Sequence, residues 1–77
     1  MVLMKLLSSE NGLIRYSYQP EKDGEPGILS YDKNNDKPKV ELVAQNDLSS
    51  TFYRNPAFSM IRKTASDPPQ ERLLMWY

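Results

Sequence analysis

Two acidic segments hold the first side chains that could do chemistry in this chain of 77 residues. The segment Asp32-Lys33-Asn34-Asn35-Asp36 offers the first, third and fifth ligand types of a calcium-binding loop. However, Lys37 stands where such a loop needs a sharply turning glycine, Pro38 follows it, and Val43 takes the place of the bidentate glutamate. We therefore interpret this segment as a polar turn between two strands, without a bound metal.

The second acidic segment is the run from Pro20 to Gly27, which carries two prolines and two glycines and is predicted to be an exposed loop. Its Glu21, Asp23 and Glu25 could hold a hard cation weakly, or two of them could share a proton if folding brought them together. Loop carboxylates outside a pocket are normally solvated. Catalysis by this loop is therefore the third hypothesis for the function, behind two binding hypotheses.

Neither histidine nor cysteine occurs anywhere in the chain. This absence removes the usual pairs of nucleophile and base, and nearly all transition-metal sites, because those sites depend on imidazole and thiolate ligands. The serines have no histidine to activate them, and none lies in a glycine-flanked nucleophile elbow. The sequence therefore predicts a protein that is not an enzyme and that uses no metal and no cofactor.

A basic and aromatic cluster is the strongest candidate for a site that binds a partner. Arg54, Phe58 and Arg62 are spaced four residues apart on a predicted helix, away from its apolar stripe, and Lys63 lies beside them. Such a set could contact a phosphate and stack on a base, or bind an acidic protein. The alternative, which we favour, is a solvated helix face with one partly buried phenylalanine.

Charge is distributed unevenly along a chain that is formally neutral. Residues 1–47 carry six basic and eight acidic side chains, hence −2, whereas residues 48–77 carry four basic and two acidic ones, hence +2. A neutral protein lacks the long-range attraction that draws nucleic acid or an anionic membrane to a basic one. Nucleic acid and membrane are therefore disfavoured partners, while the polarity favours a second copy or an acidic protein.

Three tyrosines permit two interpretations. If Tyr16, Tyr18 and Tyr31 were exposed on one sheet face near Arg15, they would form a stacking platform for single-stranded nucleic acid. Tyr16 and Tyr18 share a strand face with Ile14, however, so packing beneath a helix is the simpler use of these rings. We predict that they belong to the core.

Alternating and branched residues predict the strands that position these side chains. Four strands are expected, from Val2 to Ser8, Leu13 to Gln19, Ile28 to Tyr31 and Lys39 to Gln45. Asn11-Gly12 joins the first two, because these residue types accept the positive φ angles of a tight hairpin turn. In the fourth strand, Val40, Leu42 and Ala44 are expected to point inward.

A helix with one apolar face should follow the meander. Its apolar stripe recurs at intervals of one and four at Phe52, Tyr53, Pro56, Ala57, Met60, Ile61, Thr64 and Ala65. The start is either near Thr51 or at Pro56, where Asn55 would serve as N-cap. Asp67-Pro68-Pro69 ends the helix, because proline cannot continue it. A last strand is expected from Arg72 to Tyr77.

The fold class that follows is α+β, with a mainly antiparallel five-stranded sheet and one helix packed on one face. The favoured strand order is 5-1-2-3-4, and the alternative places the last strand parallel to the fourth. Five strands span about 19 Å, whereas a helix is about 10 Å across, so apolar surface should stay uncovered. We expect this surface at Leu73, Leu74, Met75 and Trp76, and we expect it to form a homodimer.

One domain should cover residues 1–77, because the chain contains no repeat and no linker-like change of composition. A domain of this length buries only about 60% of the surface of its unfolded chain. Self-association would bury more surface, so we expect it to contribute to stability. The apolar run Met1 to Leu7 contains Lys5, is too short to span a membrane and lacks a signal-cleavage pattern. We therefore expect a cytoplasmic protein.

The chain as a whole resembles small bacterial proteins of unassigned function. The resemblance rests on an opening strand, the stretch from Asn11 to Glu21, the Gly24-Glu25-Pro26-Gly27 turn, a single helix and a closing Trp76-Tyr77. These features are turns and aromatic residues, so the resemblance supports the fold and implies no activity. The function expected from the sequence is a non-enzymatic interaction module that self-associates; the alternative is weak binding of nucleic acid by the basic helix face.

Overall fold

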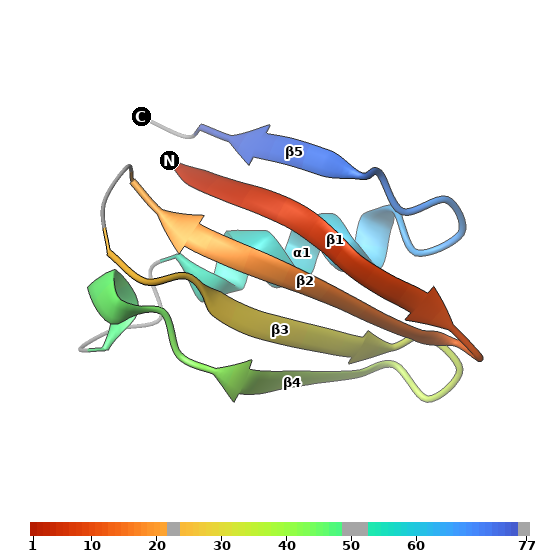
Figure 1. Cartoon of the computed structure of the whole chain (residues 1–77). Helices are drawn as coiled ribbons and strands as arrows, with labels where there is room; N and C mark the ends of the chain where they lie inside the picture. The colour runs from red at the N-terminus through yellow and green to blue at the C-terminus, as the bar shows by residue number, and fades with distance from the viewer. Residues whose placement is uncertain (22–23, 49–52, 76–77) are drawn as a thin grey trace.

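Five strands form one antiparallel sheet in the computed structural model, which describes residues 1–21, 24–48 and 53–75 (Figure 1). The elements are β1 (Val2–Glu10), β2 (Leu13–Pro20), β3 (Gly27–Asp32), β4 (Lys37–Leu42), the 3-10 turn η1 (Gln45–Asp47), α1 (Arg54–Lys63) and β5 (Glu71–Leu74). The strand order is β4-β3-β2-β1-β5, and every neighbouring pair is antiparallel. The predicted α+β class and the favoured strand order are therefore confirmed.

The hairpin between β1 and β2 is the longest local unit of the sheet. Asn11 and Gly12 have φ angles of 53° and 84°, as a two-residue turn of the primed kind requires. Beyond the turn the strands pair from Glu10 opposite Leu13 to Val2 opposite Pro20, with one bulge between Leu6 and Ser8. The predicted hairpin is confirmed, and it places the N-terminal strand next to the centre of the sheet.

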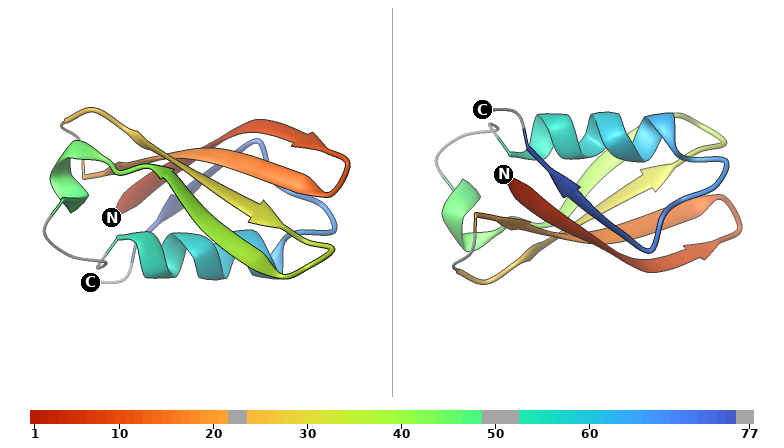
Figure 2. Two further views of the ribbon diagram at one scale, coloured as in Figure 1. Left: turned by 90° about the horizontal axis from the view of Figure 1, so that it is seen from below. Right: turned by 90° about the horizontal axis from the view of Figure 1, so that it is seen from above.

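The core lies between one face of the sheet and α1, which crosses that face, while none of the described residues forms a helix over the other face (Figure 2). Alternate residues of the strands point to this side, so Ile14, Tyr16 and Tyr18 are all buried. Ala57, Met60 and Ile61 from α1 complete the core. The prediction that Tyr16 and Tyr18 pack beneath the helix is confirmed.

The fourth strand differs from its prediction in bounds and in facing. It begins at Lys37 and ends at Leu42, because Gln45 already belongs to the 3-10 turn. Leu42 was expected to point inward, but its side chain is 52% exposed. Ile28 pairs with Leu42 and Leu29 with Val40, so Glu41 is an extra residue at a β-bulge. A bulge shifts the alternation by one residue, which turns Leu42 to the face without the helix.

The helix begins at Arg54, between the two starts considered from the sequence. Tyr53 is the residue before the first turn, and its side chain makes no capping hydrogen bond. Pro56 is the third residue of α1, where a missing N–H costs nothing because the first-turn N–H groups have no partner within the helix. An asparagine cap followed by proline at the first helical position is thus the wrong description of this helix start.

The last strand is shorter than predicted, since it spans only Glu71–Leu74. Leu74 is opposite Val2 and Leu73 is opposite Leu3, which makes β5 an outer strand beside β1. Trp76 and Tyr77, which the sequence places in the same strand, lie outside the described residues.

Candidate binding surface at the open edge of the sheet

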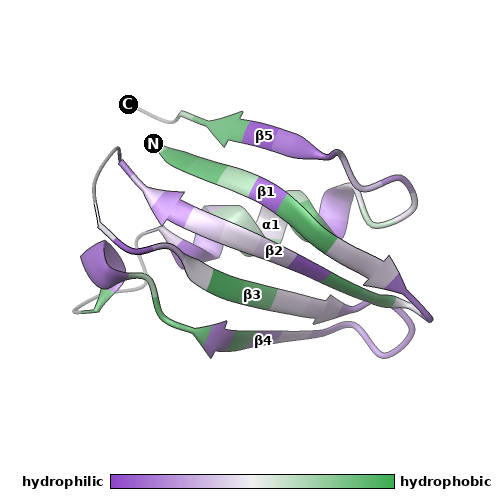
Figure 3. Ribbon diagram, in the orientation of Figure 1, coloured by the Kyte–Doolittle hydropathy of each residue, from purple (hydrophilic) through white to green (hydrophobic). Residues whose placement is uncertain are grey.

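Apolar side chains on the outer strand β5 are exposed to solvent. Leu73 is 51% exposed and Met75 is 65% exposed, whereas Leu74 is half-buried against the core. Figure 3 shows the division along the strand: its first half, Glu71 and Arg72, is hydrophilic, and its second half is hydrophobic. Of the four residues predicted for self-association, Leu73 and Met75 are therefore accessible, Leu74 is partly so, and Trp76 is outside the described residues.

The backbone of β5 leaves hydrogen-bonding groups at this edge. Leu6 N–H donates to the carbonyl oxygen of Gln70 at 2.8 Å, and the register continues from there along β5. Backbone groups of alternate residues in an antiparallel strand point to the same side. Arg72 and Leu74 therefore direct their N–H and C=O groups toward β1, while Glu71 and Leu73 direct theirs away from the sheet.

The opposite edge of the sheet is protected against strand addition. β4 begins with Lys37-Pro38-Lys39 and contains the bulge at Glu41. Lysine, proline and bulges are the devices by which natural sheets prevent edge-to-edge pairing, and Pro38 is tolerated because β4 is an outer strand. β5 carries neither lysine, proline nor a bulge, although it is only four residues long and its first half, Glu71 and Arg72, is charged. The two edges therefore differ most at Leu73 and beyond, where β5 has no such device.

The basic helix cluster predicted as a partner site is divided by the structure. Arg54 turns inward, with its Nε 2.7 Å from Oδ2 of Asp47, and Phe58 packs partly buried against the core. Arg62 pairs with Asp36 at 3.1 Å and lies 5.8 Å from the ring centre of Tyr31. Lys63 is exposed and points to a groove between α1 and β5.

Asp47 is a fully buried carboxylate that the sequence analysis did not single out. Its Oδ2 accepts a hydrogen bond of 3.0 Å from Tyr18 Oη, which in turn accepts one of 3.0 Å from Ala44 N–H. The ion pair with Arg54 balances its charge, although its Oδ1 has no hydrogen-bond partner among the described residues. Asp47, Tyr18 and Arg54 thus connect η1, β2 and α1. We call these three residues the Asp47 clasp and assign them a structural role.

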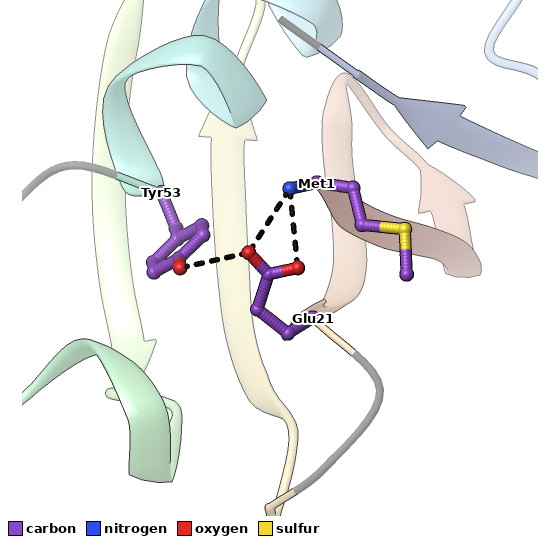
Figure 4. Close-up of polar contacts among 3 residues, drawn as sticks. All are labelled: Met1, Glu21 and Tyr53. Atoms are coloured by element: carbon purple, nitrogen blue, oxygen red, sulfur yellow. Dashed lines mark hydrogen bonds and ion pairs between the residues drawn. The ribbon is translucent and has the colours of Figure 1, made fainter. Parts of the chain in front are cut away.

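The acidic loop after β2 is engaged in structural contacts where it is described. Both carboxylate oxygens of Glu21 lie 3.4 Å from the amino group of Met1, and Tyr53 Oη donates to Oε1 at 3.2 Å (Figure 4). Burial and then this hydrogen bond raise the pKa of Tyr53. Glu25 contributes its backbone, because its N–H donates a hydrogen bond to Gln45 Oε1. Asp23 lies outside the described residues.

The polar turn before β4 uses its own carboxylates. Asp32 Oδ2 accepts a hydrogen bond from the Asn35 side chain, and Oδ1 accepts from the N–H groups of Asn34 and Asn35. The Asn35 side chain first, and then these N–H groups, lower the pKa of Asp32. Asp36 accepts from Tyr31 Oη and from Arg62, and both lower its pKa. These contacts close the hairpin as the sequence predicts. In the described part of the chain, no three acidic side chains are grouped to hold a metal ion.

The helix-free face of the sheet is polar at its centre. Arg15 of β2 makes two hydrogen bonds to the carboxylate of Glu41, at 2.9 and 3.0 Å, across the intervening strand β3. Ser30 of β3 is buried beneath this pair. Glu41 follows the inward-facing Val40, so its side chain lies on the same face as Arg15. A large apolar interface is therefore not favoured on this face.

Alkaline conditions should destabilise the fold through its buried tyrosines. Burial raises the pKa of Tyr16 and of Tyr18. The neutral phenol is thus favoured in the folded state, and this contribution is complete below the unfolded pKa of about 10 and is lost as pH rises through the raised folded pKa. Urea unfolding at pH 8, 9.5 and 11 should show a falling free energy only at the highest value. The double replacement Tyr16→Phe and Tyr18→Phe should flatten this dependence; an unchanged dependence would contradict the assignment.

Comparisons with protein-family models, with curated proteins and with solved structures found no match to this chain. The resemblance to small bacterial proteins of unassigned function therefore remains a prediction from the sequence. No helix in the described ranges is long and apolar enough to cross a membrane.

Proposed function

We propose that this protein is a cytoplasmic, non-enzymatic interaction module that forms a homodimer through the outer edge of β5. The observation that carries the proposal is the difference between the two sheet edges. β4 is blocked by Pro38, by lysines and by a bulge, whereas β5 offers the outward backbone groups of Glu71 and Leu73 beside exposed apolar side chains. Self-association would also add buried surface to a small domain.

One register of the proposed dimer is favoured over its neighbours. Two antiparallel β5 strands related by a two-fold axis keep both helices on the same side, so residues on the same face must be opposite one another. With Leu73 opposite Leu73 of the second copy, Arg72 is opposite Leu74 and all pairing falls within residues 71–75. Sliding the strands one way sets Arg72 against Arg72, which is unfavourable. Sliding them the other way leaves only residues 73–75 of the described chain to pair.

Solution mass is the first test of the proposal. Size exclusion with light scattering at several protein concentrations should give about twice the 8.9 kDa of one chain. Leu73→Pro should give a monomer with an unchanged circular dichroism spectrum, because residue 73 directs its N–H away from β1 and an outer strand tolerates proline there. Leu42→Lys, an exposed leucine at the other edge, is the matched control and should leave the dimer intact.

The register has its own test, because a chain without cysteine permits clean cross-linking. Leu73→Cys should form a disulfide between two copies under mild oxidation, since Cα atoms in a hydrogen-bonded antiparallel pair lie about 5.5 Å apart, within the range of a disulfide. Arg72→Cys should not form one. A monomer at all concentrations would overturn the homodimer, and preferential cross-linking at Arg72→Cys would overturn this register alone.

The basic helix face supports nucleic-acid binding less well. Two of its three cations, Arg54 and Arg62, already pair with carboxylates, and Phe58 packs against the core instead of presenting a ring for stacking. The chain is also neutral overall. A self-associating module is therefore the function that the contacts favour.

A further inference from the structure

A groove of about 370 Å³ runs between α1 and β5 on the helix side of the sheet. Its lining is formed by Pro56, Ser59, Met60, Lys63, Thr64, Arg72, Leu74 and Met75. The helix residues follow one another at intervals of three and four, so they form one stripe about 12 Å long. A volume of this size lies at the lower end of the range found for small-molecule sites.

The two ends of the groove differ in chemistry. α1 and β5 run in opposite directions (Figure 2), so the last turn of the helix lies beside the start of the strand. Lys63 and Arg72 therefore lie at the same end of the groove. Pro56 and Met75 lie at the other end, and Met60 and Leu74 lie between. The groove is thus cationic at one end and mainly apolar along the rest of its length, where Ser59 is a polar side chain among the lining residues.

The cations at this end are available to a ligand. Both Lys63 and Arg72 are exposed, and neither forms an ion pair within the described ranges. Among the described residues that line the groove, none is acidic. Glu71, the neighbour of Arg72, is opposite Lys5 and so belongs to the other face of the sheet. Two full positive charges exceed the partial negative charge, about half a unit, at the C-terminus of α1.

We infer that this groove binds a short aliphatic carboxylate, with the carboxylate between Lys63 and Arg72 and the alkyl chain along Met60 and Leu74 toward Met75. Arginine and lysine at one end supply charge-assisted hydrogen bonds to the carboxylate. The unbranched methionine side chains adapt to an alkyl chain. The site uses the side chains of Arg72 and Leu74 on the helix side of β5, whereas the proposed homodimer uses the outward backbone groups of Glu71 and Leu73; Met75 is shared by the two surfaces.

Octanoate is the probe for this site, with octanol and acetate as the matched ligands that lack its charge or its chain. Titration followed by amide NMR of the wild-type protein should show saturable octanoate shifts confined to residues 56–64 and 71–75. Octanol and acetate should each bind at least tenfold more weakly. Binding of octanol as tight as that of octanoate, or shifts spread over the whole sheet, would overturn the inference.

Charge variants make the assignment specific to two residues. Lys63→Gln with Arg72→Gln should weaken octanoate binding more than tenfold without changing the circular dichroism spectrum, because both side chains are exposed. Lys33→Gln, at an exposed position in the hairpin turn, is the matched control and should leave affinity unchanged. Equal affinity of the double variant and the control would overturn the inference. The monomeric Leu73→Pro protein should bind octanoate as the wild type does, which separates this site from the dimer.

Discussion

Arg54→Met should lower the free energy of unfolding by about 3–5 kcal/mol, because it leaves the buried Asp47 carboxylate without its counter-charge. The Asp47 side chain is 0% exposed and that of Arg54 is 18% exposed, so the carboxylate that loses its partner is a buried one. Tyr18 Oη would still donate to Oδ2, but one neutral donor does not balance a buried charge. Urea unfolding followed by circular dichroism measures the loss.

Two further variants decide whether the ion pair causes this effect. Arg62→Met removes a pair of similar geometry whose side chains are 53% and 67% exposed, and it should change stability little. Asp47→Asn combined with Arg54→Met removes both charges and keeps an acceptor for Tyr18, so it should recover much of the loss even if the single variant is unfolded. A single variant no less stable than Arg62→Met would contradict the structural role of the Asp47 clasp.

Gly27→Ala should destabilise the protein by about 3 kcal/mol, although alanine is compatible with the backbone angles of a strand. A Cβ at Gly27 would lie well inside 3.0 Å of the Leu42 carbonyl oxygen, the Ala44 nitrogen and the Tyr18 ring. Two of these atoms are backbone, so the start of β3 and the end of β4 would have to separate. Thermal and urea unfolding measure the effect.

Whether Gly27→Ala lowers or raises the free energy of unfolding tests the clash around Gly27. Where no clash exists, glycine to alanine stabilises a protein by about 0.4–1 kcal/mol, because the unfolded chain loses freedom. Gly12→Ala is the comparison: a Cβ there meets only the side chain of Asn34, and the left-handed backbone costs about 1 kcal/mol. A stabilised Gly27→Ala protein would show that Tyr18 does not pack directly over the start of β3.

Most of the fold follows from local patterns that the sequence makes visible. Asn11-Gly12 specifies the first hairpin, and the alternation of Ile14, Tyr16 and Tyr18 assigns one face of β2 to the core. The direction of the chain through α1 then sets β5 beside β1. These features depend on residues close in sequence or on simple connectivity, which is why the strand order could be predicted.

The features that were missed depend on distant partners. The residues next to Glu41 in the sequence do not predict a bulge, because the partner of the extra residue is Arg15, which is 26 positions away. Arg54 has the spacing of a surface residue, and its inward turn requires the buried Asp47 from η1. Their spacing on one helix predicts one patch formed by Arg54, Phe58, Arg62 and Lys63. In the structure each of these side chains has different neighbours on other elements, so they do not form one surface.

The place of β1 in the sheet has a consequence for the newly synthesised chain. β1 comes before β2 in the chain and pairs with it on one side, whereas its other neighbour, β5, is translated after the other described strands. Until residues 71–74 emerge from the ribosome, the edge of β1 with Val2, Leu3 and Met4 has no covering strand. An uncovered strand edge favours aggregation during synthesis, and a premature stop before β5 would leave the edge of β1 uncovered.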